Sequence, residues 1–490
     1  MLILKFKGTF IKGIAAIIII LYLLGSNSLA MVSENDLDKF KSKLDNIVPQ
    51  LQKRYKVPGT SIGIIKNGKV EYILNYGTAD KKGKKPVTND TIFQAASVSK
   101  SLSAFGIMHL ADEGRINIDD PAEKYLTKWH IPDSKFNKDD VTIRRLLNHT
   151  AGLSIYGYGG TKPGKKLFTT EEALSKEQGG VKIESKPGSR FSYSGGGYTV
   201  LQLIIEEVTK MPFDKYMQNE ILTPLGMMHS SYRNDFTDSN MSKAYGYFNN
   251  LLPNYNFTEE AAAGLKTTVS DFSKFIITAM DSYNGEVKEK GIISRDSMAL
   301  IKTSAGSNYQ LGGYISKMSN NNTLIYHYGN NIGWCSYYGM IPENEDGLII
   351  FTNSDNGMDV VFDVKDAWIK YETGKIEYDE IDRIRTIIFH VPIVIASLLV
   401  LYLIHFAVKL KKGIRTFMPV KSKKHILKLF LRLLVCIIIG FCWYYVFYVS
   451  NLALISAYRI KLSTYLLYVW LIGLFINGLF TKPPKRLKSR

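Results

Sequence analysis

Hydrophobic and polar residues alternate along the middle of the chain with two different periods. Between residues 35 and 55, apolar side chains such as Phe40, Leu44 and Val48 recur at the spacing of one helix face. The same periodicity predicts further helices over residues 98–113, 198–210, 270–280 and 358–371. Helices therefore account for most of the centre of this region.

Segments rich in β-branched and aromatic residues lie at both ends of the same region. Two of them flank Asn67-Gly68, a pair typical of the tight turn of a β-hairpin. Three more follow at its end, over residues 322–329, 333–341 and 347–354. Strands at both ends with helices between them predict an α+β fold, in which an antiparallel sheet receives an inserted helical region. Residues 156–190, rich in Gly, Lys and Thr, are predicted to form an exposed loop.

Three long stretches near the C-terminus contain no charged residue, at about residues 386–408, 433–455 and 462–480. Each approaches the roughly 20 residues that a helix needs to cross the hydrocarbon core of a bilayer. Buried helices of globular proteins rarely run this long without a charge. The sequence therefore predicts a membrane domain over residues 381–490 with three transmembrane helices, whose partner is the lipid bilayer.

The first 30 residues are typical of an export signal. Lys5, Lys7 and Lys12 precede the apolar run "GIAAIIIILYLLG", and small residues allow cleavage after Ala30. The alternative is an uncleaved anchor, although this apolar run is short for a membrane span. Both interpretations place the region 31–380 outside the cytoplasm.

The net charge of +18 is distributed unevenly. Residues 381–490 hold 18 Lys and Arg against one acidic residue, so the region before them is close to neutral. Nine of these basic residues lie between the first two predicted spans and five in the C-terminal tail, and positive residues stay on the cytoplasmic side. The charge therefore predicts a multi-pass cell-membrane protein with an extracytoplasmic domain and a cytoplasmic C-terminus, and it gives no support for nucleic acid as a partner.

Three cysteines limit the covalent cross-links that the chain can form. Cys335 is the only cysteine of the region 31–380, so no disulfide can form within that domain. The domain must therefore be stabilised by its own hydrophobic core, which about 350 residues can supply.

The stretch "QAASVSKSLSA" raises a chemical possibility. Ser97 and Lys100 are three residues apart, so on a helix their side chains share a face and lie within reach of a hydrogen bond. A desolvated lysine has a lowered pKa and can take the proton of a nucleophilic serine. The alternative is a helix-capping serine followed by a solvated lysine, and this pair alone does not decide between the two.

Two further positions have side chains suited to moving protons or lining a cleft. Tyr193 precedes a helix in the Gly-rich stretch "YSGGGY", and His327 lies near a strand end followed by glycine. Glycine allows backbone N–H groups to approach a substrate closely. Taken singly, Tyr193 is an ordinary packed tyrosine and His327 an edge-strand histidine; their joint occurrence with Ser97 favours a catalytic site.

Taken together, these motifs resemble those of the penicillin-recognising serine hydrolases, which include class C β-lactamases, DD-peptidases, D-aminopeptidases and related esterases. "SVSK" matches the S-x-x-K motif of this family, "YSG" its Tyr-x-Asn motif, and "HYG" its Lys-Thr-Gly motif in the His-x-Gly form. The segments "LLNHTAGL", "AAAGLKTTVSDFSKF" and "LGGY" also resemble family segments. The match is collinear over roughly residues 35–372.

The resemblance implies a role for each matching residue. Ser97 would be the nucleophile, Lys100 its base and Tyr193 the proton shuttle. The N–H groups of Ser97 and Asn330 would form the oxyanion hole, and the residues that line the substrate would be Gly195, His327, Gly329 and Asn331. No metal or cofactor is implied.

Two departures from the family pattern bear on the substrate. Gly195 stands where the family usually has Asn, and His327 where it usually has Lys, so a contact amide and a fixed cation are both missing. An exported hydrolase followed by three membrane spans also resembles the membrane-bound prodrug peptidases of the colibactin type. The predicted function is hydrolysis, outside the cell membrane, of an amide or ester next to a D-amino acid in a small molecule or peptide. The alternatives are a β-lactamase or DD-carboxypeptidase, and a non-catalytic envelope or sensor protein.

Overall fold

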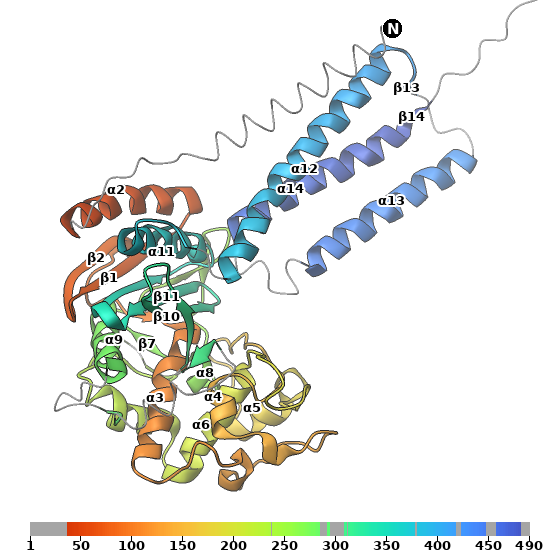
Figure 1. Cartoon of the computed structure of the whole chain (residues 1–490). Coiled ribbons are helices and arrows are strands. Elements are labelled where there is room, and N and C mark those ends of the chain that lie inside the picture. The colour runs from red at the N-terminus through yellow and green to blue at the C-terminus, as the bar shows by residue number, and fades with distance from the viewer. Residues whose placement is uncertain are drawn as a thin grey trace, which may run out of the picture.

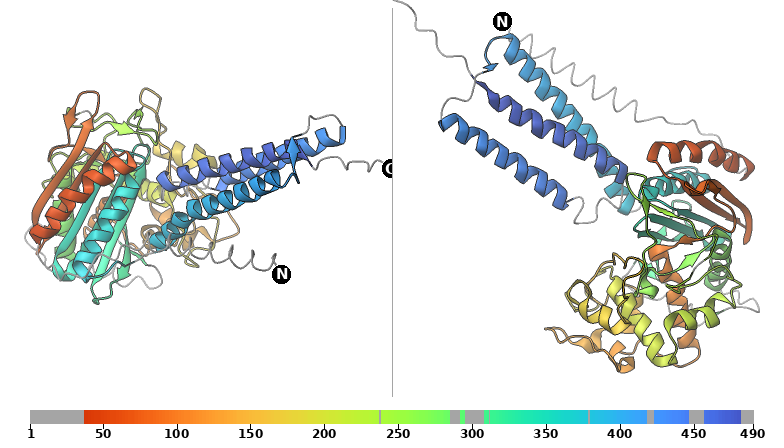
Figure 2. Two further views of the ribbon diagram at one scale, coloured as in Figure 1. Left: turned by 90° about the horizontal axis from the view of Figure 1, so that it is seen from above. Right: turned by 180° about the vertical axis from the view of Figure 1, so that it is seen from behind.

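The computed structural model describes residues 37–236, 238–284, 292–294, 308–310, 312–377, 380–417, 423–446 and 457–481. The predicted signal and the C-terminal tail therefore lie outside the described residues. A globular body precedes three long helices that project away from it (Figures 1 and 2).

The globular body is built on an antiparallel sheet of eight strands in the order β3-β2-β1-β12-β11-β10-β9-β8. The N-terminal strand β1 lies between its hairpin partner β2 and the late strand β12, so both ends of the domain meet at the centre of the sheet. This confirms the predicted α+β fold. The strand bounds are β1 Gly59–Lys66, β2 Lys69–Asp80, β3 Lys85–Pro86, β8 Tyr309–Gln310, β9 Gly313–Lys317, β10 Thr323–Asn331, β11 Trp334–Ile341 and β12 Asp346–Thr352.

The hairpin turn between β1 and β2 lies at the dipeptide that the sequence indicated. Asn67 and Gly68 have φ values of 50° and 70°, the left-handed backbone that a two-residue turn of this kind requires. Asn tolerates this region better than most residues and Gly adopts it without strain.

Helices cover both faces of the sheet. On one face, α2 (Leu37–Tyr55) and α11 (Gly357–Thr373) pack over the strands and form one hydrophobic core with them. Figure 2 shows these two helices side by side above the sheet. On the other face, α3 (Ser99–Asp112) and α9 (Val269–Asn284) belong to a second, larger core that includes the inserted helical region.

The inserted region also contains shorter elements. Among its described residues, the other α-helices are α4 Ile143–Leu147, α5 Thr170–Lys176, α6 Gly195–Thr209, α7 Phe213–Tyr216 and α8 Glu260–Ala263. The π-helical turn η5 Met217–Leu222 and the 3-10 turns η2 Ala122–Tyr125, η3 Lys138–Asp140 and η4 Glu177–Gly179 also occur there. Two short strand pairs join distant parts of it, β4 (Phe93–Gln94) with β7 (Lys266–Thr267) and β5 (Ala244–Tyr245) with β6 (Leu251–Leu252).

One prediction for this region was incomplete. The stretch 156–190 contains helix α5, whose Thr169 and Glu172 form a reciprocal capping box. Buried Ala173 and Leu174 pack this short helix against the core. The high Gly and Lys content of the stretch predicted a loop, and a helix of only seven residues was too short to alter that prediction.

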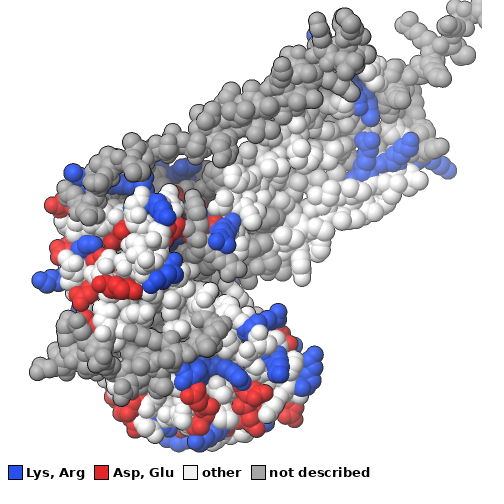
Figure 3. Space-filling view, viewed as in Figure 1, with Lys and Arg blue, Asp and Glu red and all other residues white. Residues whose placement is uncertain are grey.

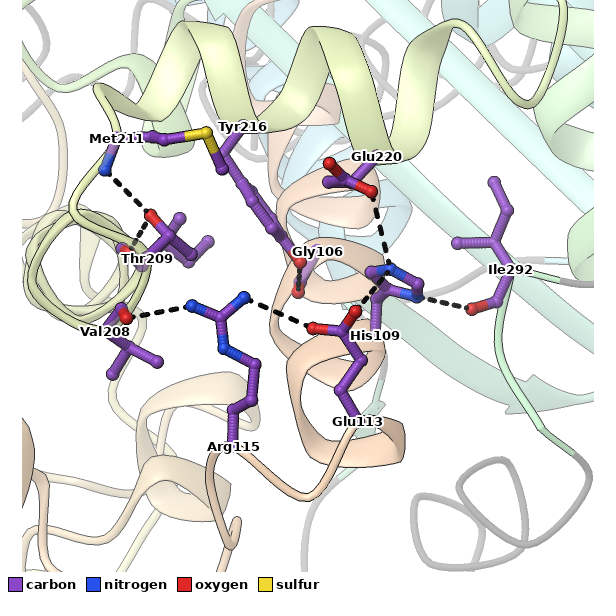
Figure 4. A network of polar contacts seen from close by, with 11 residues as sticks. Gly106, His109, Glu113, Arg115, Val208, Thr209, Met211, Tyr216, Glu220 and Ile292 are labelled. Carbon is purple, nitrogen blue, oxygen red and sulfur yellow. Dashed lines mark hydrogen bonds and ion pairs between the residues drawn. The ribbon is translucent and has the colours of Figure 1, made fainter.

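Helix α3 runs through the middle of the larger core and is buried on nearly every side. Its sequence is apolar or small almost all round, which is typical of a central helix. Figure 4 shows how its C-terminal end is held by neighbouring elements. Arg115, just after the helix, donates to the Val208 carbonyl at 2.8 Å, and the Tyr216 hydroxyl donates to the Gly106 carbonyl at 2.8 Å. The Nδ1 atom of His109 lies 3.1 Å from the carbonyl oxygen of Ile292.

The C-terminal helices have the composition of membrane spans. Three stretches are long and apolar enough to cross a bilayer, Asp382–Lys411, His425–Tyr444 and Leu462–Leu479. The first two lie in helices α12 (Glu380–Lys411) and α13 (Lys423–Tyr444), and the third runs through α14 (Ala457–Ile476) into the 3-10 turn η9 (Asn477–Leu479). Helix α14 packs against both others. The second helix starts about ten residues earlier than predicted, because its first turns carry lysines that the charge-free criterion excluded.

The surface of these helices contrasts with that of the globular body. Figure 3 shows a mixture of acidic and basic side chains on the body, a largely uncharged surface along the helices, and basic side chains at their far end. Large apolar side chains such as Ile387, Val400, Phe441 and Ile472 are more than half exposed along them. Such a surface is suited to lipid, and the helices therefore indicate membrane association.

Candidate active site

Ser97 lies in the short 3-10 turn η1 (Ala96–Val98), which leads directly into α3. The preceding residue, Ala96, has a φ of 51°, a conformation that costs a non-glycine residue about 1–3 kcal/mol. Ser97 is partly exposed, whereas Ala96 and Val98 are fully buried. The strained turn thus presents one hydroxyl to solvent at the start of a buried helix.

Lys100 lies one turn further along, with its side chain directed back toward Ser97. Its Nζ lies 3.3 Å from Ser97 Oγ and donates to the Ala262 carbonyl at 2.7 Å. The residue is 2% exposed, and among the described residues no carboxylate forms an ion pair with it. Burial lowers the pKa of Lys100 to about 7. A buried lysine without a counter-ion is therefore neutral in a large fraction of molecules near neutral pH.

Tyr193 is the third member of a group of side chains that also contains Ser97 and Lys100. It precedes α6, whose first turn is capped by Ser194. Lys100 Nζ lies 5.1 Å from the centre of the Tyr193 ring. Burial raises the pKa of the Tyr193 phenol well above its usual value, and a hydrogen bond with Ser97 acts in the opposite direction. The phenol is therefore protonated at neutral pH and lies on the same side of the site as the serine hydroxyl.

Gly329 allows strand β10 to approach the turn that carries Ser97. A Cβ atom at this position would lie 2.1 Å from Ser336 Oγ and 2.4 Å from the Ala95 carbonyl oxygen. No side chain fits in that space. Strand β10 and turn η1 can therefore lie this close together only because residue 329 is glycine.

The backbone of Asn330 faces the open side of the same strand. Asn331 pairs with Trp334 across a two-residue turn, and hydrogen-bonded and non-hydrogen-bonded pairs alternate along an antiparallel ladder. The next pair, Asn330 with Cys335, is therefore non-hydrogen-bonded. The Asn330 N–H therefore points away from β11, toward the opposite edge of β10. Strand β9 pairs with that edge only as far as Tyr326, so the edge is unpaired by β9 at Asn330.

His327 is buried in the wall of this site. Its Nε2 lies 3.0 Å from the Tyr309 hydroxyl, and its Nδ1 contacts the Tyr328 carbonyl. Because a carbonyl only accepts, Nδ1 carries the proton and Nε2 accepts from Tyr309. Burial lowers the pKa of His327 to about 3, and the positive charge of Lys100 acts in the same direction. His327 is therefore a neutral residue here.

Comparisons with known proteins bear on this arrangement. A family model described as Beta-lactamase matches residues 44–370. The chain belongs to the β-lactamase family. The protein flp of Staphylococcus aureus strain N315 is 28% identical over 338 residues, and the match spans 64% of this chain and 63% of that protein. A β-lactamase of Providencia stuartii is 27% identical over 258 residues, which span 52% of this chain and 64% of that enzyme.

Solved structures of the β-lactamase family share the fold. The octameric penicillin-binding protein homologue from Pyrococcus abyssi has a TM-score of 0.58 and 27% identity, and the match covers 72% of this chain and 81% of that one. A class C β-lactamase in complex with cefoxitin has a TM-score of 0.55 and 22% identity, and covers 67% of this chain and 97% of that one. At that identity the second likeness shows the fold alone.

Two positions at which this β-lactamase-family chain departs from the usual pattern have different surroundings. Gly195 opens α6, and a Cβ there would lie 3.2 Å from both the Tyr156 carbonyl oxygen and the Tyr158 ring. A larger residue would therefore displace Tyr158. His327, in contrast, is a neutral side chain whose Nε2 is already hydrogen-bonded to the Tyr309 hydroxyl.

Asn331 lies beside the site, but its side chain is used within the protein. The residue is 5% exposed, and its Nδ2 donates to Gln94 Oε1 at 3.1 Å and to the Ala263 carbonyl at 3.2 Å. Both amide hydrogens thus hold the strand end against β4 and α8. This placement favours a structural role for Asn331 over the predicted contact with substrate.

Three groups in the site carried no sequence prediction of their own. Ala262 receives the Lys100 ammonium, Tyr309 holds His327, and His149 lies against Tyr193 with a ring-centre distance of 4.3 Å. Ala262 and His149 fall in the segments "AAAGLKTTVSDFSKF" and "LLNHTAGL". The sequence signal for these two residues was that their segments resemble family segments. That resemblance did not indicate which side chain within each segment matters.

Proposed function

We propose that this protein is a serine hydrolase that forms an acyl-enzyme on Ser97. The observation that carries the proposal is the position of Lys100, buried without a carboxylate partner among the described residues and 3.3 Å from the Ser97 hydroxyl. Its lowered pKa of about 7 makes it a base near neutral pH. A lysine with only a structural role would gain from a counter-ion or from reaching solvent.

In the first step, neutral Lys100 takes the proton of Ser97 while Oγ attacks the substrate carbonyl. The carbonyl oxygen becomes an oxyanion, which the backbone N–H groups of Ser97 and Asn330 stabilise. Protonated Tyr193 then passes its proton to the leaving amine or alcohol as the bond to carbon breaks, and it regains a proton from Lys100. The product of this half-reaction is an ester between Ser97 and the acyl group.

The second half-reaction returns the enzyme to its starting state. Water replaces the leaving group and loses its proton through Tyr193 and Lys100 as it attacks the ester carbonyl. The Ser97 oxygen leaves and recovers a proton from Lys100. Atoms and charges balance without a metal or a cofactor.

The substrate proposed for this site is an uncharged amide or ester next to a D-amino acid, such as an N-acyl-D-amino-acid amide or a D-alanyl ester. Neutral His327 offers a carboxylate no charge, and a charge-assisted hydrogen bond contributes about 1.5–3 kcal/mol. Its absence weakens capture of a β-lactam by about ten- to a hundredfold. The preference for a D-amino acid rests on the resemblance to the penicillin-recognising hydrolases and to the colibactin-type prodrug peptidases.

The proposed place of action is the outer side of the cell membrane. The exposed apolar helices would anchor the protein in the bilayer, and the basic residues at their far end would lie in the cytoplasm. The globular body at the opposite end then faces outward.

The test compares kcat/KM for three substrate types on the full-length protein in detergent: nitrocefin, an N-acyl-D-asparaginyl amide and a D-alanyl ester. We expect the two D-amino-acid substrates to be preferred. Ser97→Ala should abolish turnover, whereas Ser189→Ala, a change at an exposed serine, should leave it unchanged. If nitrocefin is the best substrate by about tenfold or more, the β-lactamase alternative replaces this proposal.

A further inference from the structure

His149 holds the backbone of the Tyr193 segment on both sides of the tyrosine. The N–H of Ser192 donates to the His149 carbonyl at 2.7 Å. The N–H of Ser194 donates to His149 Nδ1 at 3.1 Å. The main chain of His149 therefore holds Ser192, and its side chain holds Ser194, so both neighbours of Tyr193 are fixed by one residue.

The backbone of His149 adopts a conformation that makes this double contact possible. Its φ is 57°, in the left-handed region, immediately after helix α4 and Asn148. A histidine in this region carries local strain, which the surrounding structure must offset. Strain of this kind is concentrated at positions where a fold holds a particular geometry.

The imidazole ring is also packed directly against the tyrosine that it flanks. Its centre lies 4.3 Å from that of Tyr193 and 4.5 Å from that of Tyr309, and His149 is 2% exposed. A backbone N–H can only donate, so Nδ1 is unprotonated and the proton lies on Nε2. Burial lowers the pKa of His149 well below its usual value, and a positive charge on Lys100 acts in the same direction, so this neutral tautomer persists.

We propose that His149 is the positioning residue of the site, which fixes the Tyr193 phenol against Ser97 by holding Ser192 and Ser194. It acts through Tyr193 and has no contact of its own with the substrate. The inference rests on the proposed acyl-enzyme function and adds a residue to it.

The experiment measures the second-order rate of Ser97 phosphonylation by a fluorophosphonate on the full-length protein in detergent. Fluoride leaves without a proton from Tyr193, so this rate reports how the Tyr193 phenol orients the Ser97 hydroxyl through their hydrogen bond. The main variant is His149→Gly, because glycine adopts the left-handed backbone without strain and keeps the carbonyl that receives Ser192. Only the ring and Nδ1 are lost. We expect the rate to fall by about 10- to 100-fold, as displacement of a catalytic group by about 1 Å does.

Two further variants separate positioning from folding. In His149→Asn the amide oxygen can accept from Ser194, and Asn tolerates a positive φ, so we expect a rate within about threefold of the unaltered protein. In the Tyr193→Phe background, His149→Gly should slow labelling by no more than about twofold, since the hydroxyl that it positions is already absent. A thermal melt of each variant establishes that it is folded.

Rescue by Asn together with the non-additive pair supports the inference. The inference is overturned if His149→Gly labels as fast as the unaltered protein, if Asn is as slow as Gly, or if the two changes multiply. If the unaltered protein labels no faster than Ser97→Ala, the acyl-enzyme proposal itself fails, and this result is distinct from the others.

Discussion

Lys100 holds an ionisable group in the interior at 2% exposure, with a carbonyl and a hydroxyl as its contacts. Its pKa is lowered from 10.5 to about 7. Below pH 7 the lysine is charged in both the folded and the unfolded protein, and burial of that charge destabilises the fold by about 5 kcal/mol. Between pH 7 and 10.5 the folded lysine is neutral while the unfolded one is charged, so stability rises with pH through this window.

Replacing this lysine by an apolar residue is therefore expected to stabilise the protein. Lys100→Met should raise the free energy of unfolding at pH 7 by about 2 kcal/mol while it removes activity, a trade-off common at active sites. The measurement is a denaturant or thermal melt beside Lys182→Met, a matched change at an exposed lysine. A destabilised Lys100→Met protein would contradict the burial cost argued here.

The same pKa predicts how the rate depends on pH. Neutral Lys100 is the active form, so kcat/KM should rise with pH through about 7 and level off above it. The rate of fluorophosphonate labelling should follow the same curve. Lys100→Arg should be as slow as Lys100→Ala at every pH, because a guanidinium stays protonated. A flat profile, or an active arginine variant, would exclude Lys100 as the base.

At the scale of elements, the site depends on the contact between strand β10 and turn η1. A methyl group at Gly329 would meet the Ala95 carbonyl at 2.4 Å, and that backbone atom cannot move without shifting η1. Gly329→Ala should therefore lower kcat by about 100-fold, because the strand is pushed away from Ser97. The measurement is kcat on any identified substrate, with thermal stability recorded beside it. Gly159→Ala provides a matched change at a glycine without a left-handed backbone, whose Cβ would meet nothing within 4 Å.

Most elements around the site could be predicted from the sequence. The helices over 98–113 and 198–210 and the hairpin at Asn67-Gly68 were indicated by periodicity and turn chemistry, which are local properties. The proximity of Ser97 and Lys100 also follows from local spacing, because both lie on one helical turn.

Other parts of the site depend on tertiary contacts that no local pattern encodes. Ala262 reaches Lys100 through a backbone carbonyl, so its side chain carries no signal of that contact. His149 reaches Ser194 across 45 residues of sequence. Asn331 has a polar side chain of the type that contacts substrates, yet the fold uses it to join β10 to Gln94.

In the whole molecule, the first of the three apolar helices is joined to the globular body through charged groups. Lys365 of α11 pairs with Asp382 of α12, and both are buried. Arg385 of α12 lies 3.0 Å from Asp366 and also pairs with Asp363. These ion pairs join α11 to the first turns of α12. They lie where the surface of the protein changes from mixed charge to apolar.

The charge distribution predicts the orientation of the whole chain in the membrane. A reporter that is active only in the cytoplasm should function when fused after Arg490 and should be inactive when fused after Lys375. The reason is the concentration of basic residues between the first two helices and in the tail. The opposite pattern would contradict both the orientation and the proposed place of action.

The proposed function requires Ser97 to be a nucleophile that Lys100 activates. The most direct measurement is intact-mass analysis with peptide mapping of the full-length protein after exposure to a fluorophosphonate and to a D-alanyl ester. We expect a single covalent adduct that maps to Ser97, is absent from Ser97→Ala, and forms more slowly in Lys100→Ala. An adduct at another residue, or none in the unaltered protein, would contradict it and favour the non-catalytic alternative.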